Sequence, residues 1–200
     1  MMNPVAIPIA KSRLRNASRA LAGLHAAVDD EEFVDHWTAF LTSWKGVYSV
    51  LEQGAKNSPQ SRQWFGGIKA KRKADPLLQY LFEARNDEQH GLVQSVAHTD
   101  AHRHLMRTTR EVTSMRAVYN GGGLVGMVGP DGEPCAEIVQ YIPPGPELKS
   151  VKARGDVLYH PPTEHLGNDV DASPIGVAEA ALRYVAALVD EAEARCATAP

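Results

Sequence analysis

The stretch that decides the fold is FVDHWTAFLTSWKGVYSVL, residues 33–51. Its large apolar residues recur every three or four positions, which places them on one face of a helix: Phe33, Trp37, Phe40, Trp44, Val47 and Leu51. An aromatic stripe of this kind is typical of packing between helices rather than of a cofactor site. The acidic run at residues 29–32 favours a helix start there, and we expect this helix to end near Gly54.

Further helices are predicted on both sides of this stretch. Residues 11–28 carry apolar side chains at helical spacing. Three later segments each combine a capping side chain with a proline at the first helical position: Ser58-Pro59, Asp75-Pro76 and Ser173-Pro174. We expect the helix after Pro76 to bend or loosen at Gly91 and to continue toward residue 105.

The pattern changes after residue 110, where β-branched and aromatic residues alternate with turn signals. We expect strands at 111–119, 123–128, 135–142 and 151–159, with a tight turn at residues 129–132 (Gly-Pro-Asp-Gly). The predicted fold class is α+β: a mainly α-helical bundle of about four helices with an antiparallel β-rich insert between the third and last helices. The expected divisions are 1–108 for the first part of the bundle, 109–167 for the insert and 168–200 for the last helix.

Composition excludes several classes of protein. The two cysteines, Cys135 and Cys196, are far apart, which argues against a disulfide framework and fits a reducing compartment. We find no pattern of a signal peptide near the N-terminus and no apolar stretch long enough for a membrane span, so we expect a cytoplasmic protein without a membrane partner. The net charge is −3, but residues 62–116 hold ten lysines and arginines against six acidic residues. The middle of the chain is therefore expected to present a basic surface.

The main chemical signal is Arg85-Asn86-Asp87-Glu88-Gln89-His90. An arginine binds phosphate and stabilises developing negative charge, a histidine moves protons near neutral pH, and an amide orients either group. These parts suit phosphodiester cleavage without a metal. On a helix Asn86 and His90 share a face, whereas Arg85 and His90 lie about 140° apart around the axis. The alternative is a surface ion pair between Arg85 and Glu88 beside an interior or capping histidine.

An arginine, four residues and a histidine late in a helix of a small bundle resemble the signature of the HEPN superfamily (higher eukaryotes and prokaryotes nucleotide-binding). Here the signature is Arg85, the polar Asn86 and His90. The resemblance covers the helical parts, 1–105 and 170–200, and leaves the β insert unexplained. It implies a metal-independent endoribonuclease of the toxin or defence type, with no cofactor, whose site forms where two motifs face each other in a homodimer.

In an endoribonuclease of this kind, His90 would be the general base or acid, Arg85 would stabilise the transition state and Asn86 would orient the pair. The products would carry a 2′,3′-cyclic phosphate. Superfamily members also include non-catalytic binders. The alternative function is therefore a helical dimerisation or binding module that uses the β insert as the surface for a protein partner.

A basic and aromatic stretch lies before the motif. Its basic residues are the candidate RNA contacts, because they neutralise phosphates while an aromatic side chain stacks on a base: Arg62, Lys69, Lys71, Arg72 and Lys73. The aromatic residues are Trp64 and Phe65. The alternative is a solvated segment with two core aromatics.

Two other patterns are weaker. His98 and His102 are four residues apart, so on a helix they share a face with metal-ligand spacing, and His104 follows. Without a fixed fourth ligand, we interpret them as surface histidines and expect no metal. Residues 121–126 match G-x-G-x-x-G, but no helix start follows, so a hairpin or bulge is the expected structure.

Overall fold

The computed structural model describes residues 1–90, 94–100, 102–108, 116–120, 123–142, 144–153 and 157–197. The chain divides into two compact units, one formed by Met1–Ala97 with Pro146–Pro200 and the other by His98–Gly145. The first unit holds all five helices of the described residues. The second unit is a small antiparallel sheet.

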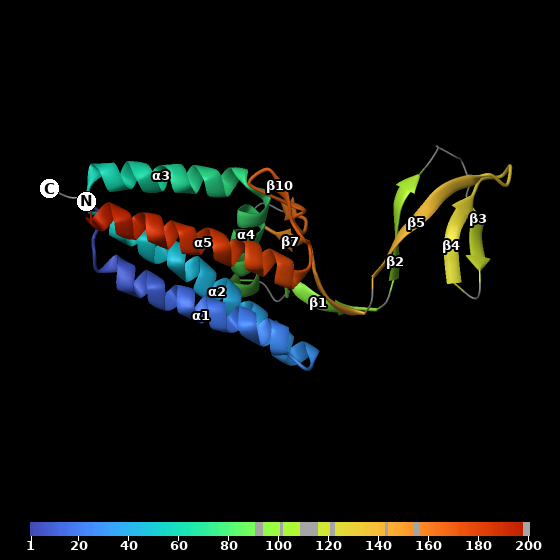
Figure 1. Cartoon of the computed structure of the whole chain (residues 1–200), viewed down its shortest axis with the longest axis horizontal. Helices are drawn as coiled ribbons and strands as arrows, with labels where there is room; N and C mark the ends of the chain where they lie inside the picture. Colours follow the sequence, from blue (N-terminus) through green and yellow to red (C-terminus); the bar gives the residue numbers. More distant parts are fainter. Residues whose placement is uncertain are drawn as a thin grey trace. The chain divides into compact units, whose positions relative to one another are not determined.

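The helical unit is built from α1 (Ala6–Ala26), α2 (Asp30–Ala55), α3 (Pro59–Ala74), α4 (Pro76–His90) and α5 (Pro174–Ala197). Figure 1 shows α1, α2, α3 and α5 running side by side, with the short α4 at the end of α3. The predicted fold class is confirmed, with five helices in the described residues where the sequence predicted about four. None of the helices in the ranges described above is long and apolar enough to cross a membrane.

α2, α3 and α5 begin where the acidic run and the capping residues predicted, whereas α1, predicted at 11–28, spans Ala6–Ala26 and has no side-chain cap. The Ser58 hydroxyl accepts the backbone N–H of Ser61 at 3.2 Å, and the Ser173 hydroxyl accepts that of Gly176 at 3.0 Å. The Asp29 carboxylate accepts the N–H of Glu32 at 2.8 Å. Each bond satisfies an N–H that has no partner within the helix, so these short signals determine where the helices start.

The core is centred on α2, whose aromatic stripe is buried as predicted. Trp37, Phe40 and Trp44 are fully buried. The Trp44 indole N–H donates to the backbone oxygen of Ala181 at 3.2 Å, which joins α2 to α5. Near the C-terminal end of α2, a Cβ added to Gly54 would lie 2.5 Å from the Cβ of Ala6. This glycine therefore allows α1 and α2 to approach closely.

The second unit is a four-stranded antiparallel sheet in the order β2-β5-β4-β3. Its strands are β2 (His102–Thr108), β3 (Arg116–Asn120), β4 (Gly123–Val128) and β5 (Pro134–Ile142). The predicted strands at 123–128 and 135–142 are confirmed, and residues 111–115 of the first predicted strand lie outside the described residues. The predicted turn is also confirmed, since the N–H of Gly132 donates to the oxygen of Gly129 at 3.0 Å.

Short strand pairs complete the chain between α4 and α5. β1 (Val96–Thr99) pairs with β6 (Gly145–Leu148), β7 (Val151–Lys152) with β8 (Leu158–Tyr159), and β9 (Glu164–His165) with β10 (Asn168–Asp169). The single strand predicted at 151–159 was wrong, because its two ends are separate strands that pair antiparallel with each other.

The prediction that α4 continues toward residue 105 was also wrong. α4 ends at His90, and residues 96–99 and 102–108 are strands. Val96 is fully buried, and the hydroxyl of Ser95 accepts the indole N–H of Trp37 at 2.8 Å. The Tyr80 hydroxyl donates to the backbone oxygen of Lys149 at 2.7 Å. These contacts hold the start of β1 and the end of β6 against the helices, which a continued helix could not do.

Candidate active site

The Arg85–His90 motif occupies the C-terminal part of α4. The helix is capped by Asp75, whose carboxylate accepts the N–H of Leu78 at 2.8 Å. Leu77, Leu78, Leu81 and Ala84 are fully buried on its inner face. His90 is the last residue of α4, and its side chain lies outside the described part of the chain. The predicted pairing of two such motifs across a homodimer is therefore not tested.

Arg85 has a buried nitrogen that no hydrogen bond satisfies. Its Nη1 atom is shielded from solvent and has no acceptor. The expected alternative was an ion pair with Glu88, but that carboxylate accepts instead from the Thr38 hydroxyl at 3.1 Å and from the backbone N–H of Ser95 at 3.2 Å. A buried guanidinium donor without a partner is unfavourable unless a ligand supplies the acceptor.

Asn86 is held between two charged residues. Its Oδ1 atom accepts a short hydrogen bond from Lys45 of α2, and its Nδ2 atom donates to Glu83 at 3.1 Å. The amide is thus fixed on the same side of α4 as Lys45. Sequence reasoning missed Lys45, which lies 41 residues before Asn86 and inside the helix that was interpreted as core.

The charges of Arg72 of α3 and Arg85 of α4 both act on Lys45 of α2. We call these three cations the cation cluster. The Lys45 Nζ atom lies 4.4 Å from the centroid of the Phe82 ring, and the Arg72 Cζ atom lies 3.8 Å from it. Both distances are within the range of cation–π attraction. Arg72 is buried at 8% exposure and donates to the Gln79 side-chain oxygen at 3.0 Å.

The electrostatics of the cluster are dominated by positive charge. Burial lowers the pKa of Lys45, the nearby charges of Arg85 and Arg72 lower it further, and Glu83 acts in the opposite direction. Burial also lowers the pKa of Arg72, which Glu83 and Glu52 partly offset. A bound anion would favour the protonated form of Lys45, so the cluster is suited to holding negative charge.

The structure distributes the five predicted RNA contacts over more than one face of α3. These residues are Arg62, Lys69, Lys71, Arg72 and Lys73. Only Arg72 among them belongs to the cation cluster. Lys69 forms a close ion pair with Glu52, and Lys71 lines a groove between α3 and α5. Arg62 and Lys73 are exposed.

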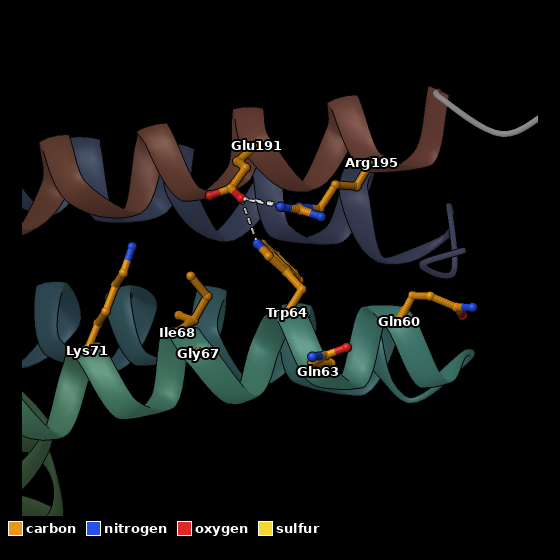
Figure 2. Close-up of a pocket in the computed structure, with 8 residues that line it drawn as sticks. All are labelled: Gln60, Gln63, Trp64, Gly67, Ile68, Lys71, Glu191 and Arg195. Atoms are coloured by element: carbon orange, nitrogen blue, oxygen red, sulfur yellow. Dashed lines mark hydrogen bonds and ion pairs between the residues drawn. The ribbon is translucent and has the colours of Figure 1, made fainter.

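The groove between α3 and α5 contains the aromatic part of the predicted stretch. It has a volume of about 500 Å³. Figure 2 shows the Trp64 indole directed across it to Glu191, and its N–H donates to that carboxylate at 2.7 Å. Arg195 pairs with the same carboxylate at 2.9 Å. Burial raises the pKa of Glu191, but the hydrogen bonds from Arg195 and Trp64 outweigh burial and lower the pKa overall. Phe65, by contrast, is a core residue.

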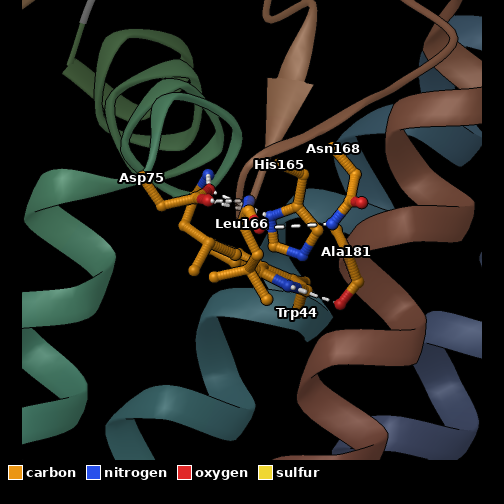
Figure 3. A network of polar contacts seen from close by, with 7 residues as sticks. Trp44, Asp75, His165, Leu166, Asn168 and Ala181 are labelled. Atoms are coloured by element: carbon orange, nitrogen blue, oxygen red, sulfur yellow. Dashed lines mark hydrogen bonds and ion pairs between the residues drawn. The ribbon is translucent and has the colours of Figure 1, made fainter.

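A second polar network, absent from the sequence predictions, joins α4 to the chain before α5. The Asp75 carboxylate accepts the N–H of Leu166 at 2.7 Å and lies 3.0 Å from Nδ1 of His165 (Figure 3). Leu166 and Gly167 adopt positive φ angles of 51° and 79°, and they form the tight turn that joins β9 to β10. The predicted cap at Asp75 was the available signal, but nothing local in the sequence indicated a partner 90 residues later.

The weaker patterns have different outcomes. His98 lies in β1, and His102 and His104 lie in β2. The helix on which His98 and His102 would have shared a face is therefore absent from these described residues. The side chains of His102 and His104 are outside the described residues, and the described side chains hold no group of three or more potential metal ligands. Of the segment 121–126 predicted as a hairpin or bulge, residues 121–122 lie outside the described residues, and residues 123–126 belong to β4, whose Gly123 pairs with Asn120 of β3.

Comparisons with protein-family models, with curated proteins and with solved structures gave no match to this chain. Three features of the chain therefore bear on its function: the motif, the helical architecture with its small antiparallel β insert, and the contacts of the described residues.

Proposed function

We propose that this protein is a HEPN-like, metal-independent endoribonuclease that acts as a homodimer. The observation that carries the proposal is the unpartnered Nη1 atom of Arg85, late in α4 of a helical bundle. A donor left without an acceptor inside a protein is a common feature of sites that complete their hydrogen bonds with a ligand. The position of the motif on the bundle agrees with the HEPN signature.

The proposed reaction is an internal transfer within the RNA strand. The 2′-oxygen attacks the neighbouring phosphorus as its proton passes to a base, and the bond from phosphorus to the 5′-oxygen breaks as that oxygen gains a proton. His90 supplies the proton transfer at one of these oxygens. Arg85 stabilises the charge on the phosphoryl oxygens, and Asn86, fixed by Lys45 and Glu83, orients the pair.

A second copy of the chain completes the site in this proposal. Arg85 and His90 are five residues apart, and the helical period separates such residues by about 140° around the axis. Two motifs facing each other across a two-fold axis would bring the arginine of one protomer toward the histidine of its partner. The exposed basic residues of α3, Arg62, Lys71 and Lys73, then extend the path of the RNA strand.

Cleavage of RNA in EDTA tests this function. Wild-type protein is expected to cleave single-stranded RNA, and Arg85→Ala and His90→Ala are each expected to lower the rate by about 100-fold or more, the usual scale for losing a charge-stabilising or proton-transfer group. Arg19→Ala and His25→Ala provide matched controls, because both residues are exposed on α1. A wild-type rate that EDTA abolishes, or motif variants as active as the controls, would contradict the proposal.

The non-catalytic binding module remains the alternative, and one observation favours it. Residues His98–Gly145 form a compact unit of their own, as expected for a separate binding surface. In that case purified protein cleaves no RNA, and Arg85→Ala changes stability or partner binding instead of turnover. Deletion of the strands would then abolish capture of the protein partner without affecting dimerisation of the helices.

A further inference from the structure

We propose that the cation cluster, formed by Lys45, Arg72 and Arg85, is a binding site for a phosphate group. The inference goes beyond the proposed cleavage reaction, because it requires neither His90 nor turnover. It assigns a role to Lys45 and Arg72, which have no part in the Arg85–His90 motif. It also accounts for the convergence of three positive side chains from α2, α3 and α4.

Geometry provides the first argument. Lys45 and Arg72 both lie against the Phe82 ring, at 4.4 and 3.8 Å from its centroid. The charges of Arg72 and Arg85 both act on Lys45, so the three cations lie close enough to influence one another. Arg72 is buried at 8% exposure, so it contributes mainly through its charge. Lys45 and Arg85 are only half-buried, so part of each side chain is accessible to an anion.

Unused hydrogen-bond donors provide the second argument. An ammonium group has three N–H donors, and Lys45 directs one of them to Asn86. The Nη1 atom of Arg85 is buried without any acceptor. A phosphate group offers several acceptor oxygens in a tetrahedral arrangement, which matches donors that approach from different helices.

Charge balance provides the third argument. The carboxylate of Glu83 is the acidic group that acts on both Lys45 and Arg72. It is already shared, since it accepts from Asn86 at 3.1 Å and from Gln79 at 2.8 Å. Glu52 also acts on Arg72 but is paired with Lys69. Three cations against one shared carboxylate leave a local excess of positive charge, which a phosphate anion would neutralise.

Binding of two probes tests the site at pH 7 and constant ionic strength. Inorganic phosphate is titrated by calorimetry, and a fluorescent 2′-O-methyl oligoribonucleotide, which cannot be cleaved through its 2′-oxygen, is titrated by anisotropy. Lys45→Gln and Arg85→Met are each expected to weaken binding by about tenfold, the usual effect of losing a hydrogen bond from a charged group. For the oligonucleotide, the slope of log affinity against log salt is expected to fall by about 0.7 for each lost phosphate contact.

Lys56→Gln is the matched control, because Lys56 is an exposed lysine just after α2 and outside the cluster. It should bind both probes as the wild type does, and His90→Ala should keep its affinity whether or not the wild type cleaves RNA. If Lys45→Gln and Arg85→Met lose affinity for both probes, the ligand is a phosphate of an RNA strand. If they lose affinity for inorganic phosphate alone, the ligand is a small phosphorylated molecule. If the wild type binds neither probe, or if Lys45→Gln and Arg85→Met match Lys56→Gln, the site does not exist. Circular dichroism of each folded variant excludes loss through unfolding.

Discussion

Arg85→Met is expected to make the ligand-free protein more stable. The buried Nη1 atom has no acceptor, and an unsatisfied buried donor costs about 1–3 kcal/mol of folding free energy. Arg85 also adds positive charge beside Lys45, whose pKa is lowered first by burial and then by Arg85. Methionine keeps an unbranched apolar stem of similar length. Because Arg85 is only half-buried, we expect the low end of this range: a gain of about 1 kcal/mol, or about 2–4 °C in Tm for a chain of this size.

Thermal denaturation followed by circular dichroism at 222 nm measures this change in the helices. Arg19→Met is the control, since Arg19 is exposed on α1, and it should stay within about 0.5 kcal/mol of the wild type. Phosphate should reverse the order: at about 100 times its Kd it adds about 2.7 kcal/mol to the wild type and less to Arg85→Met. A lower Tm for Arg85→Met without phosphate would refute the reasoning, because it would mean that the guanidinium already has favourable partners.

Three further predictions follow from packing, from hydrogen bonding and from charge. Gly54→Ala should lower the free energy of unfolding by about 1–3 kcal/mol, because the new Cβ would lie 2.5 Å from a side chain of α1. Gly66→Ala should raise the free energy of unfolding by about 0.5–1 kcal/mol, because its new Cβ meets nothing within 4 Å and alanine favours the helix. Urea denaturation measures both variants against the wild type. Asp75→Asn should lower the free energy of unfolding by about 2 kcal/mol, because the amide nitrogen that replaces one carboxylate oxygen cannot accept the hydrogen bonds that hold the His165 loop. Equal urea midpoints for the variant and the wild type would contradict this. Phosphate affinity should fall as pH rises toward 10.5, because burial and neighbouring cations hold the pKa of Lys45 below that value. Calorimetry between pH 7 and 10.5 measures this fall in the wild type and should show no such fall in Lys45→Gln. Over the same window the contribution of Lys45 to stability should rise with pH, because the folded chain loses this proton before the unfolded chain does.

The helices were largely predictable because their signals are local. A capping residue followed by proline lies at the start of α3, α4 and α5, and the Ser58 and Ser173 caps form the predicted hydrogen bonds. The stripe of α2 was predictable because its spacing alone determines one buried face. The turn at Gly129–Gly132 was predictable for the same reason, since its residue types specify the backbone.

The strands after α4 were not predictable, because pairing in a sheet depends on partners far along the chain. β1 pairs with β6, and β2 pairs with β5, across tens of residues. A helix and a short strand both accommodate the apolar residues around Val96. The burial of Val96 and the hydrogen bonds from Trp37 and Tyr80 to Ser95 decide between them. Periodicity within so short a segment could not reveal that environment.

The candidate site was predictable in part. The motif located Arg85 and Asn86, because their residue types and spacing are visible in one helix. Lys45 and Arg72 could not be assigned to the same site, since they come from other helices: Lys45 meets the motif through its hydrogen bond to Asn86, and both residues contact Phe82. Lys45 also lies within the helix whose pattern indicated core packing, and so its charge was overlooked.

The measurement that tests the central claim most directly is the chemistry of the RNA ends after cleavage by wild-type protein in EDTA. Mass spectrometry of a short single-stranded substrate distinguishes the two outcomes. The account predicts a 2′,3′-cyclic phosphate on one product and a 5′-hydroxyl on the other, both lost in Arg85→Ala and His90→Ala. A 3′-hydroxyl with a 5′-phosphate, or the same products from both variants, would contradict it.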